Sequence, residues 1–271
     1  MKRITLRRLA LRLALACMLL AAALPSAVLA QGPQAQSPQP GESAMYEAHP
    51  DQAAKQVTVG VLLFPGFEML DAYGPMEMWG SLKHAPARFW GGAEKRVSAR
   101  LVTIAANRGA IASNQGPKTV ADYSYADAPK LDYLLVPGGI GAVSLVRDAA
   151  TLDWLRAQVG KTKVIMSVCN GASLLAAAGI LDGRPATTNK MAFKDSTAPG
   201  PKVNWVKQAR WVDDGSVVSS SGVSAGMDMT LAVIARLYGQ PVSDWLAQIT
   251  EYDAHRDPSW DPFAVKAGLI R

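Results

Sequence analysis

The residue best placed to do chemistry is Cys169, which lies between two short segments of different character. Residues 164–168 (VIMSV) form an apolar, partly β-branched run that predicts a buried strand. Residues 172–178 are rich in Ala and Leu and predict a helix. The small residues Ser167 and Gly171 flank Cys169, as a sharp turn from strand to helix requires. This is the pattern of a nucleophile elbow, with cysteine where serine is usual.

A thiol at this junction faces the free amides and the positive end of the following helix. Both stabilise a thiolate, so Cys169 is expected to react with iodoacetamide well below about pH 8.5, the reference pKa of a free cysteine. The alternative is that Cys169 is a small buried hydrophobic residue, as most free cysteines are. The local pattern leaves both interpretations open.

A second candidate, Asp71, follows the first predicted strand. Residues 57–64 (VTVGVLLF) are an almost continuous apolar run, typical of a central parallel strand. Pro65 and Gly66 turn the chain, and a helix is predicted from the next residues to about residue 82. Asp71 therefore lies just beyond the carboxyl end of the strand, where open α/β sheets have their ligand crevices. It is equally suited to stabilise the first turn of the helix, and both roles are compatible.

The elements that must position these residues alternate between strand and helix. This order predicts one doubly wound α/β domain over residues 57–266, with a mostly parallel central sheet and no second domain. The other predicted elements are strands at 97–105 and 132–136, hairpins at 110–122 and 209–219, helices at 149–159 and 227–238, and a final helix from about residue 241.

Glycines directly follow the strand at 132–136. Gly138 and Gly139 belong to a PGGIG sequence, and glycines after a strand let backbone amides approach a ligand closely. Too few residues match the dinucleotide or P-loop fingerprints, so we predict no nucleotide cofactor. The cysteine and histidine residues show no spacing typical of a metal site, and we predict no metal.

The N-terminus has the composition of a targeting segment. Five basic residues precede an apolar run, and a small-residue cleavage pattern ends at Ala30, so residues 1–30 are predicted to be a signal peptide. The sequence does not decide between the general and the twin-arginine export route. Residues 31–56, rich in Gln, Pro, Ser and Ala, are predicted to be a disordered leader. We therefore expect a periplasmic or secreted protein without a stable membrane anchor.

Removing the signal changes the charge and cysteine content of the protein. The chain has 28 basic and 22 acidic residues, and the signal holds five of the basic ones, so the mature net charge is +1. This balance gives no basis for a nucleic-acid-binding surface. Cys17 leaves with the signal, and Cys169 then has no partner for an internal disulfide. A lone thiol in an exported protein is a liability unless it is buried or used.

Taken together, these segments resemble the ThiJ/PfpI superfamily, whose fold is flavodoxin-like and amidotransferase-like. The LD-x-x-GP element at residues 70–75 and ITEYD at residues 249–253 look most like the isonitrile hydratase branch. The resemblance implies that Cys169 attacks the isonitrile carbon of a small-molecule substrate, that Asp71 serves as acid and base, and that the protein is a homodimer. Its most specific motifs are VGVLLFPGFEMLDAYGPMEMW, DYLLVPGG, VCNGASLLAAAGILDGRPATTN and SSGVSAGMDMTLAVIARLYG.

The chain departs from this family pattern around the thiol. The hydratases have threonine after the cysteine, whereas this chain has Asn170. The Asn170 side chain is expected to narrow the space above Cys169 and to present its NH₂ group there. Alternatively, this side chain forms a hydrogen bond with a neighbouring loop. The positions where hydrolytic relatives need a histidine hold Asn170 and Asn189, so we expect no Cys–His triad. Regulators of this family carry a helix-turn-helix extension, and we expect none here, because the chain ends too soon.

The expected reaction is addition of water to an isonitrile through a covalent thioimidate on Cys169. Amides of Gly138, Gly139 and Asn170 are expected to bind the developing charge. Asp71 is expected to have a raised pKa, because two neighbouring anions disfavour each other. Two alternatives stay open: a glyoxalase-like enzyme acting on reactive carbonyls with the same thiolate, and a non-catalytic redox sensor whose thiol is oxidised reversibly.

Overall fold

The fold is described from a computed structural model, which places residues 55–271. The predicted signal peptide, residues 1–30, and nearly all of the predicted leader, residues 31–56, lie outside the described residues. The first strand begins at Lys55, two residues before the predicted domain boundary, because Lys55 and Gln56 already pair with the neighbouring strand.

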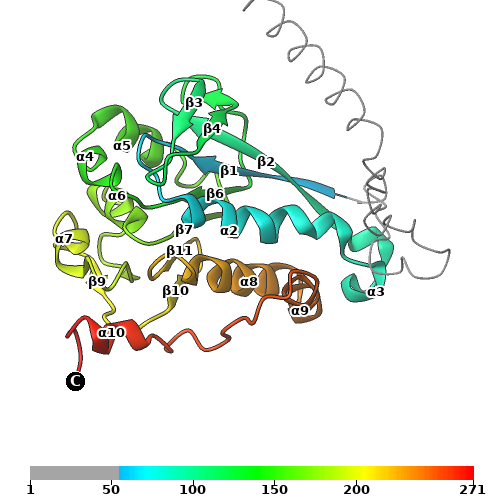
Figure 1. The fold of residues 1–271 in the computed structure, drawn as a ribbon. Coiled ribbons are helices and arrows are strands. Elements are labelled where there is room, and N and C mark those ends of the chain that lie inside the picture. Colours follow the sequence, from blue (N-terminus) through cyan, green and yellow to red (C-terminus); the bar gives the residue numbers. More distant parts are fainter. Residues whose placement is uncertain (1–54) are drawn as a thin grey trace, which may run out of the picture. The chain divides into compact units, whose positions relative to one another are not determined.

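A seven-stranded sheet forms the centre of the domain (Figure 1). All neighbouring strands are parallel except β10 and β11, so the predicted mostly parallel sheet is confirmed. The strands, in their order across the sheet, are β10 (Trp211–Asp214), β11 (Val217–Ser220), β7 (Val164–Ser167), β6 (Tyr133–Val136), β1 (Lys55–Leu62), β2 (Val97–Ala105) and β5 (Tyr123–Ser124).

Helices cover both faces of this sheet, as Figure 1 shows. On one face α2 (Met69–Gly80) packs against α8 (Ala225–Tyr238), and α8 packs against α9 (Gln240–Ile249). On the other face α6 (Gly171–Ala177) packs against α5 (Ala149–Arg156) and α4 (Ala142–Leu145). The doubly wound α/β fold predicted from the alternation of strands and helices is therefore confirmed.

The strands that lead to the candidate site are the most deeply buried. Every residue of β6 and of β7 is buried, as are the last four residues of β1. Strands covered on both faces are apolar along their whole length, which is why these segments lack an alternating pattern. Each buried Val, Leu or Ile contributes about 1.5–3 kcal/mol relative to an exposed one, and this core fixes the carboxyl ends of the strands.

Short elements differ most from the sequence-based expectation. The hairpin predicted at 110–122 is present as β3 (Gly109–Ala112) and β4 (Lys118–Ala121), and the first helix ends at Gly80 before the 3₁₀ helix η3 (Ser81–His84). Several short elements lack a periodic pattern and form through tertiary contacts, so the sequence does not predict them. They include α4, β5, α3 (Ala87–Trp90), η4 (Ala93–Lys95), β8 (Pro185–Ala186), α7 (Phe193–Thr197), β9 (Asn204–Trp205) and α10 (Pro262–Lys266).

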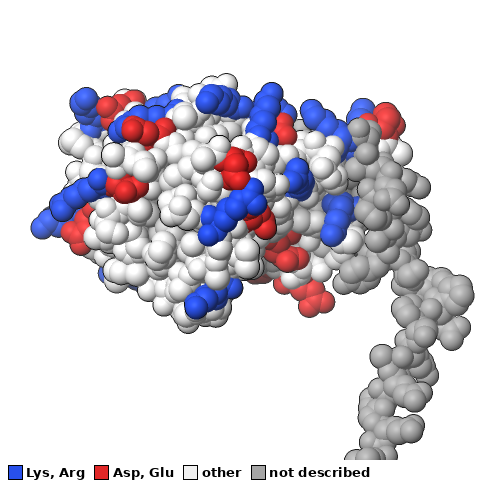
Figure 2. Space-filling model, turned by 90° about the horizontal axis from the view of Figure 1, so that it is seen from above, with Lys and Arg blue, Asp and Glu red and all other residues white. Residues whose placement is uncertain are grey.

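The surface of the domain has charges of both signs. In the view of Figure 2, basic and acidic side chains are interspersed and separated by wide uncharged areas. Within residues 55–271, none of the helices is both long enough and apolar enough to cross a membrane.

Candidate active site

The elbow predicted around Cys169 is present between β7 and α6. Cys169 has a φ of +57°, in the left-handed region that non-glycine residues rarely adopt. Its amide donates to the Ser221 carbonyl at 2.9 Å, which fixes the turn to the end of β11. A Cβ at Gly171 would lie 2.3 Å from the Val136 carbonyl oxygen, so only glycine allows α6 to begin so close to β6. The thiol residue is 8% exposed.

The structure brings Asp71 and Cys169 together. Asp71 lies in the first turn of α2 and is fully buried. The two residues come together because β1, which precedes Asp71, and β7, which precedes Cys169, end at the same edge of the sheet. Asp71 Oδ2 accepts a hydrogen bond from the Gly138 amide at 2.8 Å. Its Oδ1 has no hydrogen-bond partner in the described part of the chain. The carboxyl lies against the Cys169 thiol, and each group shifts the pKa of the other.

Burial, above all, raises the pKa of Asp71 to about 7, from 3.8. The Gly138 hydrogen bond opposes this shift, the negative charge of Glu68 adds to it, and the nearby Cys169 thiol lowers the pKa. The raised pKa predicted for Asp71 is therefore confirmed, but its expected cause is wrong. Removal of the carboxyl from water, not repulsion by a thiolate, is the largest effect.

The low pKa predicted for Cys169 is wrong. Burial raises its pKa to about 12, and the negative charge of Asp71 raises it further in the same direction. The Asn170 amide at the start of α6 lowers the pKa, but this does not offset removal from water. Cys169 is therefore a neutral thiol at rest, and any nucleophilic step needs a neighbouring group to accept its proton.

Three donors from separate segments point toward the sulfur and lower its pKa. They are the backbone amides of Asn170 and Val223 and the side-chain amide of Asn189, whose Nδ2 lies 3.1 Å from Sγ. Val223 has a φ of +29°, a strained value for a β-branched residue. These groups favour negative charge on sulfur when it forms or leaves.

The glycine amides expected to bind developing charge already have partners. The Gly138 amide donates to Asp71, and the Gly139 amide donates to Asn170 Oδ1 at 2.7 Å. Asn170 Nδ2 in turn donates to the Gly139 carbonyl at 3.0 Å. The prediction that the amides of Gly138 and Gly139 are free to bind a ligand is therefore wrong, whereas the backbone amide of Asn170 does face the sulfur. The Asn170 side chain holds the neighbouring loop, the alternative considered for it.

Gly138 lets these groups come together. A Cβ there would lie 2.2 Å from Asn170 Oδ1 and 2.9 Å from Asp71 Oδ2. The glycine thus brings the backbone close to both side chains, rather than presenting its amide to a ligand.

Sequence reasoning missed two of the sulfur's neighbours, Asn189 and Val223. The sequence identifies Asn189 only as a residue that replaces a histidine of hydrolytic relatives. Its position directly after the ATT sequence is the signal that could have placed it beside the thiol. Val223 belongs to the SSGVSAG motif, whose strand end was recognised without a role. The two histidines within residues 55–271 lie elsewhere: the His255 ring stacks on Trp260, and His84 lines a separate surface pocket. Among residues 55–271, no group of three or more His, Cys, Asp or Glu is arranged to hold a metal ion.

A cavity of about 600 Å³ opens above Cys169. Asp71 is fully buried and is not among the residues that line this cavity. The polar groups of its base, next to Cys169, belong to Asn170 and Asn189. The charged side chains that line it are Glu68, Arg147 and Asp195, and much of the remaining wall is apolar. The apolar lining residues are Ile140, Ala142, Val143, Val146, Ala192, Ala198, Pro199 and Val223.

The fold is that of a known family. Residues 57–236 match the DJ-1/PfpI family, and the chain belongs to it. Isonitrile hydratase from Pseudomonas putida is 33% identical over 194 residues, which cover 72% of this chain and 78% of that protein.

Relatives of other kinds share the domain. The transcriptional regulator GbdR from Pseudomonas aeruginosa is 26% identical over 77% of this chain, which spans 54% of the regulator's length. A ThiJ/PfpI family protein from Pseudomonas syringae has a similar crystal structure, with a TM-score of 0.65 and 26% identity. The similarity covers 88% of this chain and 92% of that one. Family membership therefore establishes the fold, while enzymes and regulators both occur among the relatives.

Replacing Asp71 with asparagine is expected to change how stability depends on pH. Because the folded pKa of Asp71 is raised from 3.8 to about 7, the folded state binds its proton more tightly than the unfolded state. The resulting stabilisation is complete below about pH 4 and is lost as pH rises through about 7. A shift of this size corresponds to about 4 kcal/mol, so Asp71→Asn is expected to be more stable than the parent at about pH 8.

Urea unfolding of both proteins from about pH 4 to about pH 8 measures this difference. Other titrating groups are the same in both proteins and cancel. Parallel pH dependences would show that Asp71 is ionised in the folded protein throughout this range.

The Cys169 thiol is expected to react slowly with iodoacetamide. At about pH 7.5 the parent should be alkylated more slowly than free cysteine, because burial and the charge of Asp71 raise the pKa of Cys169. Peptide mapping assigns the label to Cys169, and labelling in urea gives the rate of the unfolded thiol. A native rate equal to that of free cysteine would contradict the raised pKa.

Proposed function

We propose that the protein is a cysteine-dependent hydratase that converts an isonitrile to an N-substituted formamide. The observation that carries this proposal is the proximity of the buried Asp71 carboxyl and the Cys169 thiol at the carboxyl ends of parallel strands, where each group shifts the pKa of the other. A proton acceptor whose pKa is about 7 beside a neutral thiol suits addition of S–H to an electrophilic carbon. The 33% identity to isonitrile hydratase supports the same class of reaction.

In the first step the sulfur of Cys169 bonds to the terminal carbon of R–N≡C. The thiol proton passes to the ionised Asp71 carboxylate, which then gives it to the same carbon. The product is a thioformimidate, R–N=CH–S–Cys169. Because the pKa of Asp71 lies near 7, accepting and returning the proton are both accessible near neutral pH.

In the second step water adds to the carbon of the C=N bond. The nitrogen receives one proton of the water, and the C–S bond then breaks to release R–NH–CHO. Asp71 carries the remaining proton from the hydroxyl back to the sulfur. The amides of Asn170, Val223 and Asn189 stabilise negative charge on the leaving sulfur, as an oxyanion hole does for oxygen.

The shape of the cavity supports a substrate with an apolar substituent. A volume of about 600 Å³ and apolar walls such as Ile140 and Val143 suit a hydrocarbon group of several carbons. The small reacting carbon would lie at the polar base, next to the thiol.

The redox-sensor alternative has less support. Oxidation to sulfenic acid proceeds through an accessible thiolate, whereas Cys169 is 8% exposed and its pKa is raised to about 12. Export and the homodimer stay predictions, the first from residues 1–30 and the second from the family resemblance.

The purified protein is expected to convert cyclohexyl isocyanide to its formamide, which proton NMR detects through the formyl signal. Cys169→Ala removes the nucleophile and should abolish turnover. Asp71→Asn should lower kcat about 100-fold or more, because it removes the group that moves the proton. Asp153→Asn, on the exposed part of α5, is the matched carboxyl-to-amide control and should retain the parent rate.

Two results would contradict the hydratase proposal. One is near-normal turnover of Asp71→Asn, which would reduce Asp71 to a helix-stabilising residue. The other is the absence of formamide from every isonitrile tried while Cys169 can still be alkylated. Consumption of α-oxoaldehydes by that same protein would then favour the carbonyl enzyme.

A further inference from the structure

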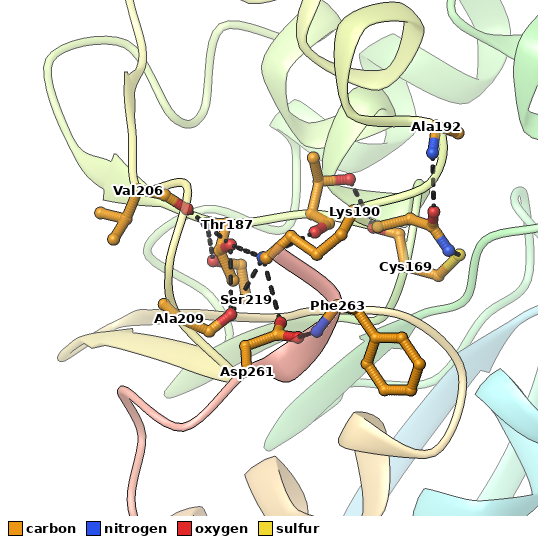
Figure 3. Close-up of polar contacts among 11 residues, drawn as sticks. Cys169, Thr187, Lys190, Ala192, Val206, Ala209, Ser219, Asp261 and Phe263 are labelled. Atoms are coloured by element: carbon orange, nitrogen blue, oxygen red, sulfur yellow. Dashed lines mark hydrogen bonds and ion pairs between the residues drawn. The ribbon is translucent and has the colours of Figure 1, made fainter. Parts of the chain in front are cut away.

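A lysine is buried one residue beyond the asparagine that contacts the thiol. Lys190 is 2% exposed, and its Nζ donates to Thr187 Oγ1 at 2.5 Å, the Thr188 carbonyl at 3.0 Å and the Ala209 carbonyl at 2.9 Å. All three ammonium protons therefore have acceptors. Figure 3 shows Lys190 with its Nζ directed toward Thr187 and Ala209. A buried ammonium is unfavourable unless it is paired, so the position calls for an explanation.

Its charged partner comes from the C-terminal part of the chain. Asp261 Oδ2 lies 3.5 Å from Lys190 Nζ, and both side chains are almost completely buried (Figure 3). Asp261 Oδ1 accepts the Phe263 amide at 3.0 Å and so caps α10. Burial lowers the pKa of Lys190 to about 8, and Asp261 opposes that shift. The pair therefore ties α10 to the segment of residues 187–190.

Two other residues of this segment contact Cys169 directly. Thr188 Oγ1 donates to the Cys169 carbonyl at 2.9 Å, and Asn189 Nδ2 lies 3.1 Å from Sγ. The Ala192 amide donates to Asn189 Oδ1 at 2.9 Å, which orients the side-chain NH₂ toward the sulfur. The segment thus holds both the strained backbone and the sulfur of Cys169, while Lys190 holds the segment.

We propose that Lys190 and Asp261 are positioning residues that hold the Asn189 amide against the Cys169 sulfur. Through them, the reactivity of the thiol depends on the C-terminal helix α10. Neither residue lines the cavity above Cys169, so neither meets a substrate there. The inference rests on the proposed function only in taking Cys169 as the reacting group.

A double-mutant cycle on thiol reactivity tests this positioning role without any substrate. Asn189→Ala should slow alkylation of Cys169 about tenfold, the loss expected for one hydrogen bond to an anion. Lys190→Met and Asp261→Asn should each slow it in the same direction and shift the pH profile of alkylation upward. In the Asn189→Ala background, Lys190→Met should have no further effect, because its action passes through Asn189.

A matched control separates positioning from simple loss of stability. Asp132 forms an ion pair with Lys163 at 2.8 Å and accepts the Thr58 amide at 2.9 Å. Asp132 and Lys163 directly precede β6 and β7, at the ends of these strands that lie away from Cys169. Asp132→Asn should therefore lower the melting temperature and leave alkylation at the parent rate.

The proposal is overturned if Lys190→Met and Asp261→Asn lower the melting temperature without changing alkylation. It is also overturned if the effects of Asn189→Ala and Lys190→Met add in the double variant. If Lys190→Met does not fold, Lys190→Met combined with Asp261→Asn removes both buried charges, and Asp261→Asn alone still provides the comparison. Failure of the hydratase assay would leave all these rates unaffected, so the two proposals fail separately.

Discussion

Two acidic groups share one buried space in this protein, and the rest of the site depends on that constraint. The Asp71 carboxyl and the Cys169 thiol are both removed from water, so both favour their neutral forms. Each proton that leaves the sulfur must go to a neighbour, and Asp71 is that neighbour. The chemistry of the site is therefore proton exchange between two groups, rather than attack by a free thiolate.

Positioning such a pair requires contributions from separate parts of the fold. Buried parallel strands bring Asp71 and Cys169 to one edge of the sheet, and Gly138 lets the backbone approach both Asp71 and Asn170. Donors from the elbow, the 187–190 segment and the turn after β11 surround the sulfur. Ionisation of a buried carboxyl and the left-handed backbone conformation of Cys169 both reduce the stability of the folded protein. Functional sites commonly hold such strain, which well-packed strands on either side offset.

The sequence predicted the parts that depend on local pattern. Continuous apolar runs indicated strands covered on both faces, and the small residues around Cys169 indicated the elbow; the structure contains both. The direction of the Cys169 pKa shift was not predictable, because burial of the sulfur results from packing by distant segments. The same holds for Gly138 and Gly139, whose amides have side-chain partners far away in the sequence. The pairing of Lys190 with Asp261 crosses 71 positions and has no local signature.

The central claim is that Asp71 is a proton carrier with a pKa near 7, held against the thiol. Carbon-13 NMR of protein labelled at the aspartate side-chain carboxyl measures this directly, and the signal missing from Asp71→Asn identifies the residue. We expect a signal that changes from the protonated to the ionised position with a midpoint of about pH 7. A carboxyl that is already ionised at about pH 5, as an ordinary aspartate is, would contradict it.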